Sequence, residues 1–345
     1  MEYRPGVALI YGGVGCERDV SISGAKYLCT LIDRSKYDLI CILINELGEW
    51  MLCDPASPET ESQAVHPIRM YGRGGILSGG DFYPIDAAFP LLHGDFGEDG
   101  ITQGLLTSLG IPYVGCDGIS GGVALDKVYT KILAEYLSIP TASFISASPG
   151  LTSSQLDTLK RKAEAAIGYP MFMKPARLGS SVGIAEVNSP DDFISAYKIA
   201  SAHGGCVLIE KRINIAYEAE CAYFSVKNKE IITNPGAISC SDGCYDYDKK
   251  YSGSQGASIL TSPPFTEKER EKIKSYAKKI SEFLMLRHLS RIDFFVTEEG
   301  EILFNEINTM PGFTSDSLYP KLIEASGLGI KAAVDLMLKD AMGSK

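Results

Sequence analysis

The most informative stretch of the chain is SRIDFFVTEEGEILFNEINTMPGF, residues 290–313. Two apolar runs rich in strand-forming residues flank Glu299-Gly300, a pair that suits the two-residue loop of a β-hairpin. Because side chains alternate between the two faces of a strand, this register brings four polar residues to one face. They are Arg291 opposite Asn308, and Asp293 opposite Glu306. The sequence therefore predicts a hairpin on which two carboxylates, an amide and a guanidinium converge.

The chemistry of this face favours a divalent cation. Carboxylate and amide oxygens suit Mg²⁺, which keeps waters and takes its other ligands from substrate phosphates. Two carboxylates are costly to bury without a compensating cation. The alternative is a solvent-facing hairpin whose charges pair across the strands. The turn at residues 309–313, TMPGF, favours the binding site, since its backbone N–H groups can face a developing oxyanion.

Length and composition argue against a nucleic-acid-binding or membrane-spanning protein. The chain has 345 residues, of which 45% are hydrophobic and 22% charged, and its net charge is -10. This length predicts about two or three domains. The acidic balance argues against a nucleic-acid partner, and no apolar run approaches the ~20 residues that span a membrane. Nine cysteines without a C-x-x-C pair, and no visible secretory signal, lead us to expect a cytoplasmic protein.

The first third of the chain alternates strand-like and helical segments. The strand-like segments are residues 7–11, 39–44 and 87–92, and apolar residues recur at helical spacing over 22–32 and 101–109. This alternation predicts a parallel sheet covered by helices. Residues 54–81, rich in Pro, Gly and Ser, are expected to form an irregular excursion.

The remainder of the chain shows a second pattern of helices and strands. We expect helices over residues 126–137, 154–167 and 267–286, and a helix near 193–200 that begins with Ser189 as N-cap and Pro190 at its first position. The polar, Gly- and Ser-rich stretch 239–258 is too long for an ordinary connection and is predicted to be a functional lid.

Two further segments have the composition of ligand loops. Residues 174–183, KPARLGSSVG, place a lysine after an apolar strand and before a glycine-rich loop, which can cradle phosphate; a plain β-turn is the alternative. Residues 93–100, HGDFGEDG, open a helix and contain His93, with a structural histidine and an Asp99 N-cap as the alternative. Gly13-Val-Gly15 begins a dinucleotide motif, but Arg18 stands at its third glycine position.

In combination, these segments resemble the D-alanine:D-alanine ligase family of ATP-grasp enzymes over almost the whole chain. The landmarks occur in order: GGVGCERDVS (12–21), LHGDFGEDGITQG (92–104), LDK (125–127), MKPARLGSSVG (173–183), IEK (209–211), YDYDKKY (245–251), SRID (290–293) and NEINTMPGFTSDS (305–317). The resemblance implies an α/β protein with an N-terminal parallel-sheet, pre-ATP-grasp domain and a two-lobed ATP-grasp fold. The implied divisions are 1–121, 122–211 and 212–345, with the lid near 239–258.

The resemblance also implies an activity. ATP phosphorylates one D-alanine, the amine of a second attacks the acyl phosphate, and D-alanyl-D-alanine forms for peptidoglycan precursor synthesis. ATP and two Mg²⁺ or Mn²⁺ ions would be required, and a homodimer is expected.

Site residues follow from the same resemblance. The metal ligands would be Asp293, Glu306 and Asn308. ATP would be bound by Lys127, Lys174, Glu210, Lys211, Ile213, Glu218 and Lys250. The first D-alanine would meet Glu17 and His93, and the second Ser317 and Leu318. Arg291 and the Gly312 N–H would stabilise the acyl phosphate and the tetrahedral oxyanion. Glu17, Ser180 and Tyr251 match the hydrogen-bonded triad through which the lid closes.

Several positions depart from the family pattern or leave alternatives. Glu218 is reached only through a one-residue insertion after Glu210, Asp316 replaces a usual histidine, and His288 replaces a usual glycine. D-Serine, and less readily D-lactate, remain alternative second substrates, although Leu318 and Tyr251 resemble the D-alanine type. Outside this activity, the alternatives are a non-catalytic nucleotide-binding protein and an NAD-dependent oxidoreductase.

Overall fold

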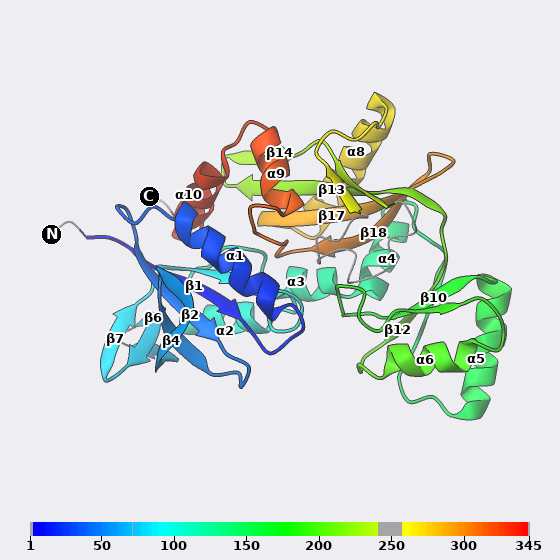
Figure 1. The fold of residues 1–345 in the computed structure, drawn as a ribbon, viewed down its shortest axis with the longest axis horizontal. Coiled ribbons are helices and arrows are strands. Elements are labelled where there is room, and N and C mark those ends of the chain that lie inside the picture. The colour runs from blue at the N-terminus through cyan, green and yellow to red at the C-terminus, as the bar shows by residue number, and fades with distance from the viewer. Residues whose placement is uncertain (1–2, 71, 241–256, 344–345) are drawn as a thin grey trace.

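The computed structural model describes residues 3–70, 72–240 and 257–343. Three larger sheets follow one another along the chain, each packed against helices, and a small three-stranded sheet lies within the N-terminal part (Figure 1). In the part of the chain that is described, no helix combines the length and apolar character needed to cross a bilayer.

The N-terminal sheet has five strands in the order β4-β3-β2-β1-β8. Strand β1 (Gly6–Gly12) runs parallel to β2 (Asp38–Ile44) and β8 (Ala87–Leu91), and β3 (Trp50–Asp54) and β4 (Ser57–Ala64) add antiparallel. Every residue of β1 is buried, because α1 (Arg18–Leu31) packs on one face of the sheet and α2 (Ile101–Leu109) on the other. The predicted parallel sheet covered by helices is confirmed for these three strands.

The expectation of an irregular excursion over residues 54–81 is wrong. This segment contains β4, and then β5 (His66–Met70), β6 (Arg73–Ser78) and β7 (Asp81–Pro84), which form a separate antiparallel sheet. Two of its glycines, Gly79 and Gly80, form the turn between β6 and β7, and both have positive φ. Strands β4, β5 and β7 are largely exposed and lack the apolar alternation that would have identified them. Strand β6 is mostly buried, but it contains Gly74-Gly75, a pair that is typical of a turn.

The central sheet has the order β11-β10-β12-β9. Its strands are β9 (Phe144–Ala147), β10 (Met171–Pro175), β11 (Ala185–Val187) and β12 (Val207–Lys211), and it packs against α5 (Ser153–Ala166) and α6 (Phe193–Ser201). The predicted Ser189 N-cap is wrong, because α6 begins at Phe193. The Asp192 carboxylate accepts hydrogen bonds from the Ser189 N–H and hydroxyl, which closes a turn ahead of the helix instead.

The C-terminal sheet has six strands, in the order β16-β15-β13-β17-β18 with β14 beside β13. The strands are β13 (Ile215–Val226), β14 (Lys229–Ile232), β15 (Gly236–Cys240), β16 (Ala257–Leu260), β17 (His288–Thr297) and β18 (Ile302–Asn308). The ends of the predicted 239–258 loop are strand, since Ser239 pairs with Ser258. The rest of that loop, including Lys250 and Tyr251, lies outside the described residues.

Helices complete this part of the molecule. They are α3 (Gly118–Leu125) and α4 (Lys127–Tyr136), which contact β18, and α8 (Glu267–Phe283), α9 (Leu318–Ala325) and α10 (Ile330–Ala341). Helix α8 begins where predicted, with Thr266 and Glu269 forming a capping box, but it ends three residues before 286. Figure 1 shows α10 beside the N-terminal sheet, and one apolar core joins the two.

The hairpin of β17 and β18 has the predicted pairing with a different loop. Asp293 pairs with Glu306, and Arg291 with Asn308, as expected. The loop spans residues 298–300 rather than Glu299-Gly300, because the Thr297 N–H donates to the Glu301 carbonyl. A one-residue bulge at Asn305 restores the register, since Asp293 faces Glu306 while its neighbour Phe294 faces Phe304.

His288 connects three parts of the chain. It is fully buried at the start of β17, and its φ of 66° lies in the left-handed region that glycine adopts without strain. Its Nδ1 accepts the Gly115 N–H at 2.9 Å, and its Nε2 lies 3.2 Å from the Asp340 carboxylate. Since Nδ1 must stay unprotonated to accept, the fold holds the neutral imidazole. Burial, helped by the neighbouring Arg287, lowers the pKa of His288 to about 4.

The His288 contacts predict acid sensitivity. A histidine with a lowered native pKa contributes stability above its unfolded pKa of about 6.5 and loses it as the pH falls toward 4. Between pH 8 and pH 5 the wild type should therefore lose about 2 kcal/mol of unfolding free energy that His288→Gln does not lose. Urea unfolding of both proteins at the two pH values measures this. Equal losses would show that His288 is not held neutral.

Candidate active site

A row of carboxylates crosses three strands of the C-terminal sheet. Glu220 on β13 pairs with Asp293 on β17, which pairs with Glu306 on β18, so all three side chains lie on one face. Glu218 shares this face two residues away, and both β13 glutamates are buried. Glu220 was not predicted as a site residue. The alternation Glu218-Ala219-Glu220 within a strand does indicate that the two glutamates share one face. The face is more acidic than predicted.

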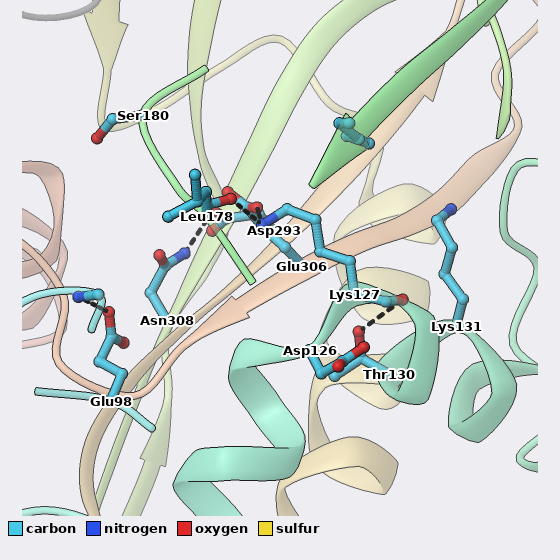
Figure 2. Close-up of polar contacts among 12 residues, drawn as sticks. Glu98, Asp126, Lys127, Thr130, Lys131, Leu178, Ser180, Asp293, Glu306 and Asn308 are labelled. Atoms are coloured by element: carbon cyan, nitrogen blue, oxygen red, sulfur yellow. Dashed lines mark hydrogen bonds and ion pairs between the residues drawn. The ribbon is translucent and has the colours of Figure 1, made fainter. Parts of the chain in front are cut away.

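Two cationic side chains contact this row. Arg291 donates to both oxygens of Asp293, at 2.8 and 2.7 Å, and its Nε lies 3.0 Å from a Glu220 oxygen. Lys127, from the first turn of α4, lies 3.0 Å from Glu306 and donates to the Leu178 carbonyl at 2.8 Å (Figure 2). Arg291 is thus shared by two buried carboxylates, and the two cations offset only part of the negative charge of the row. The remaining charge favours a bound cation.

The donor set fits a magnesium site that is completed by a ligand. In Figure 2, Asp293, Glu306 and Asn308 converge from β17 and β18, and the Asn308 amide nitrogen donates to Asp293 at 3.0 Å. Within residues 3–70, 72–240 and 257–343, no three His, Cys, Asp or Glu side chains are arranged to bind a metal ion. Two carboxylates and one amide oxygen supply part of an octahedral shell, and Mg²⁺ commonly takes the rest from phosphates and water.

A buried lysine pair surrounds Glu210. Lys174, at the end of β10, and Lys131, on α4, lie 2.5 and 2.8 Å from the two Glu210 oxygens. Burial alone would raise the pKa of Glu210, but the two ammonium groups lower it to about 2. Burial lowers the pKa of Lys131, which also donates to the Thr141 hydroxyl. Lys131 was missed, although it lies one helical turn after Lys127 and so shares its face of α4 (Figure 2).

The glycine-rich loop at residues 177–183 reaches the N-terminal domain. Ser180, with a φ of 54°, donates to a Glu17 oxygen at 2.6 Å. Glu17 is the N-cap residue of α1, and a Cβ on Gly94 would lie only 2.8 Å from its other oxygen. The structure thus brings together the predicted residues Glu17 and Ser180, while Tyr251, the third member of the predicted triad, lies outside the described residues.

The remaining predicted nucleotide residues are near β12 and β13. Lys211 ends β12, and its ammonium donates to the Tyr169 carbonyl at 2.9 Å. Ile213 is half-buried in the connection between the two strands, and Glu218 is buried on β13. These three residues therefore follow Glu210, which pairs with Lys131 and Lys174, within eight positions of the chain.

The turn after β18 lies against the N-terminal domain. The Met310 carbonyl lies 2.7 Å from His93 Nδ1, and Glu98 accepts the Met310 N–H at 2.9 Å and the Thr309 hydroxyl at 3.3 Å. Glu98 also accepts the Gly94 N–H at 3.1 Å. Burial raises the pKa of Glu98 to about 7. Sequence reasoning missed Glu98, because its partners are distant in the chain.

Gly312 and Ser317 lie close together beyond this turn. A Cβ on Gly312 would lie 3.1 Å from the Ser317 hydroxyl oxygen, so a larger residue would crowd it. That hydroxyl accepts the Thr314 N–H at 3.0 Å, at the N-terminus of α9. Leu318 is buried in the same apolar core as Phe313. The exposed Asp316 pairs loosely with Lys321 at 3.8 Å.

Comparisons with known proteins agree with this arrangement. Family models described as D-ala D-ala ligase N-terminus and C-terminus match residues 6–116 and 133–339. A D-alanine–D-alanine ligase from Thermoanaerobacter sp. is 37% identical and is aligned over 98% of this chain and 96% of its own length. D-alanyl-alanine synthetase A from Vibrio cholerae matches with a TM-score of 0.88 at 29% identity, over 99% of both chains. The VanG D-Ala:D-Ser ligase from Enterococcus faecalis matches with a TM-score of 0.86 at 31% identity, also over 99% of both chains.

Proposed function

Because the chain belongs to the D-alanine–D-alanine ligase family, we propose that it joins two D-alanine molecules using ATP. The α/β class and ATP-grasp fold agree with the solved structures that it matches. The observation that most strongly supports the proposal is that basic side chains, acidic metal ligands and the glycine-rich loop at residues 177–183 lie together at one site. Lys127 links two of these directly, since it contacts both Glu306 and the Leu178 carbonyl.

The nucleotide would lie between the central and C-terminal sheets. Lys127 and Lys174 would contact its phosphates. The remaining nucleotide contacts are proposed for Glu210, Lys211, Ile213, Glu218 and Lys250. Two Mg²⁺ or Mn²⁺ ions, held by Asp293, Glu306 and Asn308, would supply neutralising charge against the phosphate oxygens.

The chain's own residues then position the reactants. Glu17 would hold the ammonium of the first D-alanine, with His93 beside it, while a carboxylate oxygen of that substrate attacks the γ-phosphorus and ADP leaves. The amine of the second D-alanine attacks the acyl carbon, and phosphate departs. Arg291 and the Gly312 N–H would stabilise the negative charge that develops. Positioning of this kind lowers the activation barrier by ~7–11 kcal/mol, and one oxyanion donor lowers it by ~3–4 kcal/mol.

The lid is proposed to exclude water from the acyl phosphate. Its components would be residues 239–258, with Tyr251 joining the pair of Glu17 and Ser180. The Glu17–Ser180 hydrogen bond supports this proposal, because it already spans the two segments that such a lid would cover.

We favour D-alanine as the second substrate. Leu318 follows Ser317 and is apolar, so it offers no hydrogen bond to a hydroxyl group on a D-serine side chain. The match to a D-Ala:D-Ser ligase keeps D-serine as the second candidate. We further propose divisions at residues 1–121, 122–211 and 212–345, and a cytoplasmic homodimer that supplies D-alanyl-D-alanine for peptidoglycan precursors.

Phosphate release tests the proposed activity. Purified protein with ATP and Mg²⁺ should release phosphate when D-alanine is the sole amino acid, and D-alanyl-D-alanine should be detected by mass spectrometry. Release only from a mixture of D-alanine and D-serine would establish the alternative acceptor. Tight ATP binding without release from any D-amino acid would contradict a ligase.

A further inference from the structure

The Met310 backbone is held from both sides by the N-terminal domain. The Met310 N–H donates to Glu98 Oε1 at 2.9 Å, and the Met310 carbonyl lies 2.7 Å from His93 Nδ1. The first bond fixes the peptide before Met310 and the second fixes the peptide after it. Because a carbonyl only accepts, His93 must carry its proton on Nδ1.

This double contact determines where the Gly312 N–H points. Residue 311 is proline, whose ring fixes φ near −65°. Between the held peptide after Met310 and the nitrogen of Gly312, only the ψ torsion of Pro311 remains to be set. The space at Gly312 is also restricted, since a Cβ there would lie 3.1 Å from the Ser317 hydroxyl oxygen. The orientation of a proposed oxyanion donor thus depends on two side chains from another part of the chain.

Glu98 is poorly explained by stability alone. It is 6% exposed, and its hydrogen-bond partners are neutral: two backbone N–H groups, from Gly94 and Met310, and the Thr309 hydroxyl. Burying a carboxyl group among neutral partners is costly, and its raised pKa of about 7 reflects that cost. A carboxyl group can nevertheless accept from all three donors at once, which an apolar side chain cannot do.

We propose that Glu98 is a positioning residue for the ligase reaction: with His93, it holds the Met310 backbone so that the Gly312 N–H faces the tetrahedral oxyanion. This inference rests on the proposed function. Glu98 touches no reacting atom itself and acts through the turn at residues 309–313. His93 has a second role in this arrangement, because its proton on Nδ1 leaves Nε2 as an acceptor. That Nε2 is buried, has no hydrogen-bond partner in the described chain, and suits the ammonium of the first D-alanine.

The test compares Glu98→Gln and Glu98→Ala with Asp99→Asn. Glu98→Gln keeps the shape of the side chain, but its NH₂ group must face either the Gly94 N–H or the Met310 N–H. One of the hydrogen bonds that tie the turn to residues 94–98 is therefore lost. We expect kcat to fall about tenfold to a hundredfold, KM for ATP to stay within about twofold, and affinity for a phosphinate analogue of the tetrahedral intermediate to fall in parallel with kcat. Asp99 is the matched control. Its carboxylate caps the Phe96 and Ile101 N–H groups in the same loop but does not reach Met310, so its variant should keep wild-type kcat.

A second measurement does not depend on turnover. Hydrogen exchange of peptides covering residues 305–316 should accelerate in both Glu98 variants and not in Asp99→Asn, while the thermal unfolding midpoint of Glu98→Gln confirms that it is folded. A folded Glu98→Gln protein with unchanged exchange and unchanged kcat would overturn the proposal. So would a variant that loses ADP affinity as much as kcat. If the wild type shows no D-alanine-dependent phosphate release, the proposed function fails, and the exchange result still decides whether Glu98 holds the turn.

Discussion

Replacement of Glu306 by glutamine is expected to lower D-alanine-dependent phosphate release by about a thousandfold, while D-alanine affinity changes by less than about threefold. Glu306 lies opposite Asp293 in the hairpin and 3.0 Å from Lys127. Glu306 is proposed to bind the metal ions that contact the ATP phosphates. These ions are needed for phosphoryl transfer rather than for binding the amino acid. A neutral amide of the same shape removes the charge and leaves the strand pairing in place. Steady-state kinetics and calorimetric titration with D-alanine measure the two quantities.

Glu299→Gln is the matched control for this prediction. Glu299 belongs to the same hairpin but lies in its exposed loop, so the same change of charge should leave turnover within about twofold. An equal loss of D-alanine affinity and turnover in Glu306→Gln would place Glu306 at the amino acid instead of at the metal.

Replacement of Lys131 by methionine is expected to lower the unfolding free energy by about 1–3 kcal/mol. Lys131 is 1% exposed, and it balances the buried Glu210 together with Lys174. Methionine fills similar volume without charge, and Lys174 still pairs with Glu210, so the loss measures the missing Lys131–Glu210 contact rather than a cavity. The Lys131 donation to Thr141, whose hydroxyl in turn donates to the Phe304 carbonyl, is lost as well. Urea unfolding gives the free energy, and the affinity for ADP should fall at the same time because Lys174 is drawn more tightly to Glu210.

A double-mutant cycle isolates the pair. If Lys131 acts through Glu210, Lys131→Met combined with Glu210→Gln should cost at least about 1 kcal/mol less than the sum of the two single changes. Lys162→Met, on the exposed face of α5, is the control and should stay within about 0.5 kcal/mol of wild type. Strict additivity of the two changes would show that Lys131 is held by the apolar surroundings and not by Glu210.

The local pattern of apolar residues correctly predicted the helices and strands in which that pattern is strongly periodic. The buried strands β1, β2 and β8, the start of α8, and the pairing of Asp293 with Glu306 all followed from residues close together in the chain. The predicted hairpin loop was one residue too short. The pairing of Asp293 with Glu306 was nevertheless correct, because the bulge at Asn305 compensates for the extra loop residue. Strands β4, β5 and β7 were not predicted because exposed, polar strands lack apolar alternation, and β6 was not predicted because Gly74-Gly75 is typical of a turn.

The missed site residues share a different cause. Glu98, Lys131 and Glu220 are all buried, and each acts on a group contributed by another element: the Met310 backbone, Glu210 and Arg291. Their identities are visible in the sequence, but their partners are fixed only when the sheets pack together. Family resemblance supplied the residues expected to touch ligands. It did not supply the residues that neutralise or orient them, which required the structure.

The most direct test of the account is anomalous diffraction from crystals grown with ADP and Mn²⁺. We predict manganese peaks within bonding distance of Asp293, Glu306 and Asn308, on the side of the hairpin where Lys127 contacts Glu306, with the nucleotide bound beside them. A bound nucleotide with no manganese at these three side chains would contradict it.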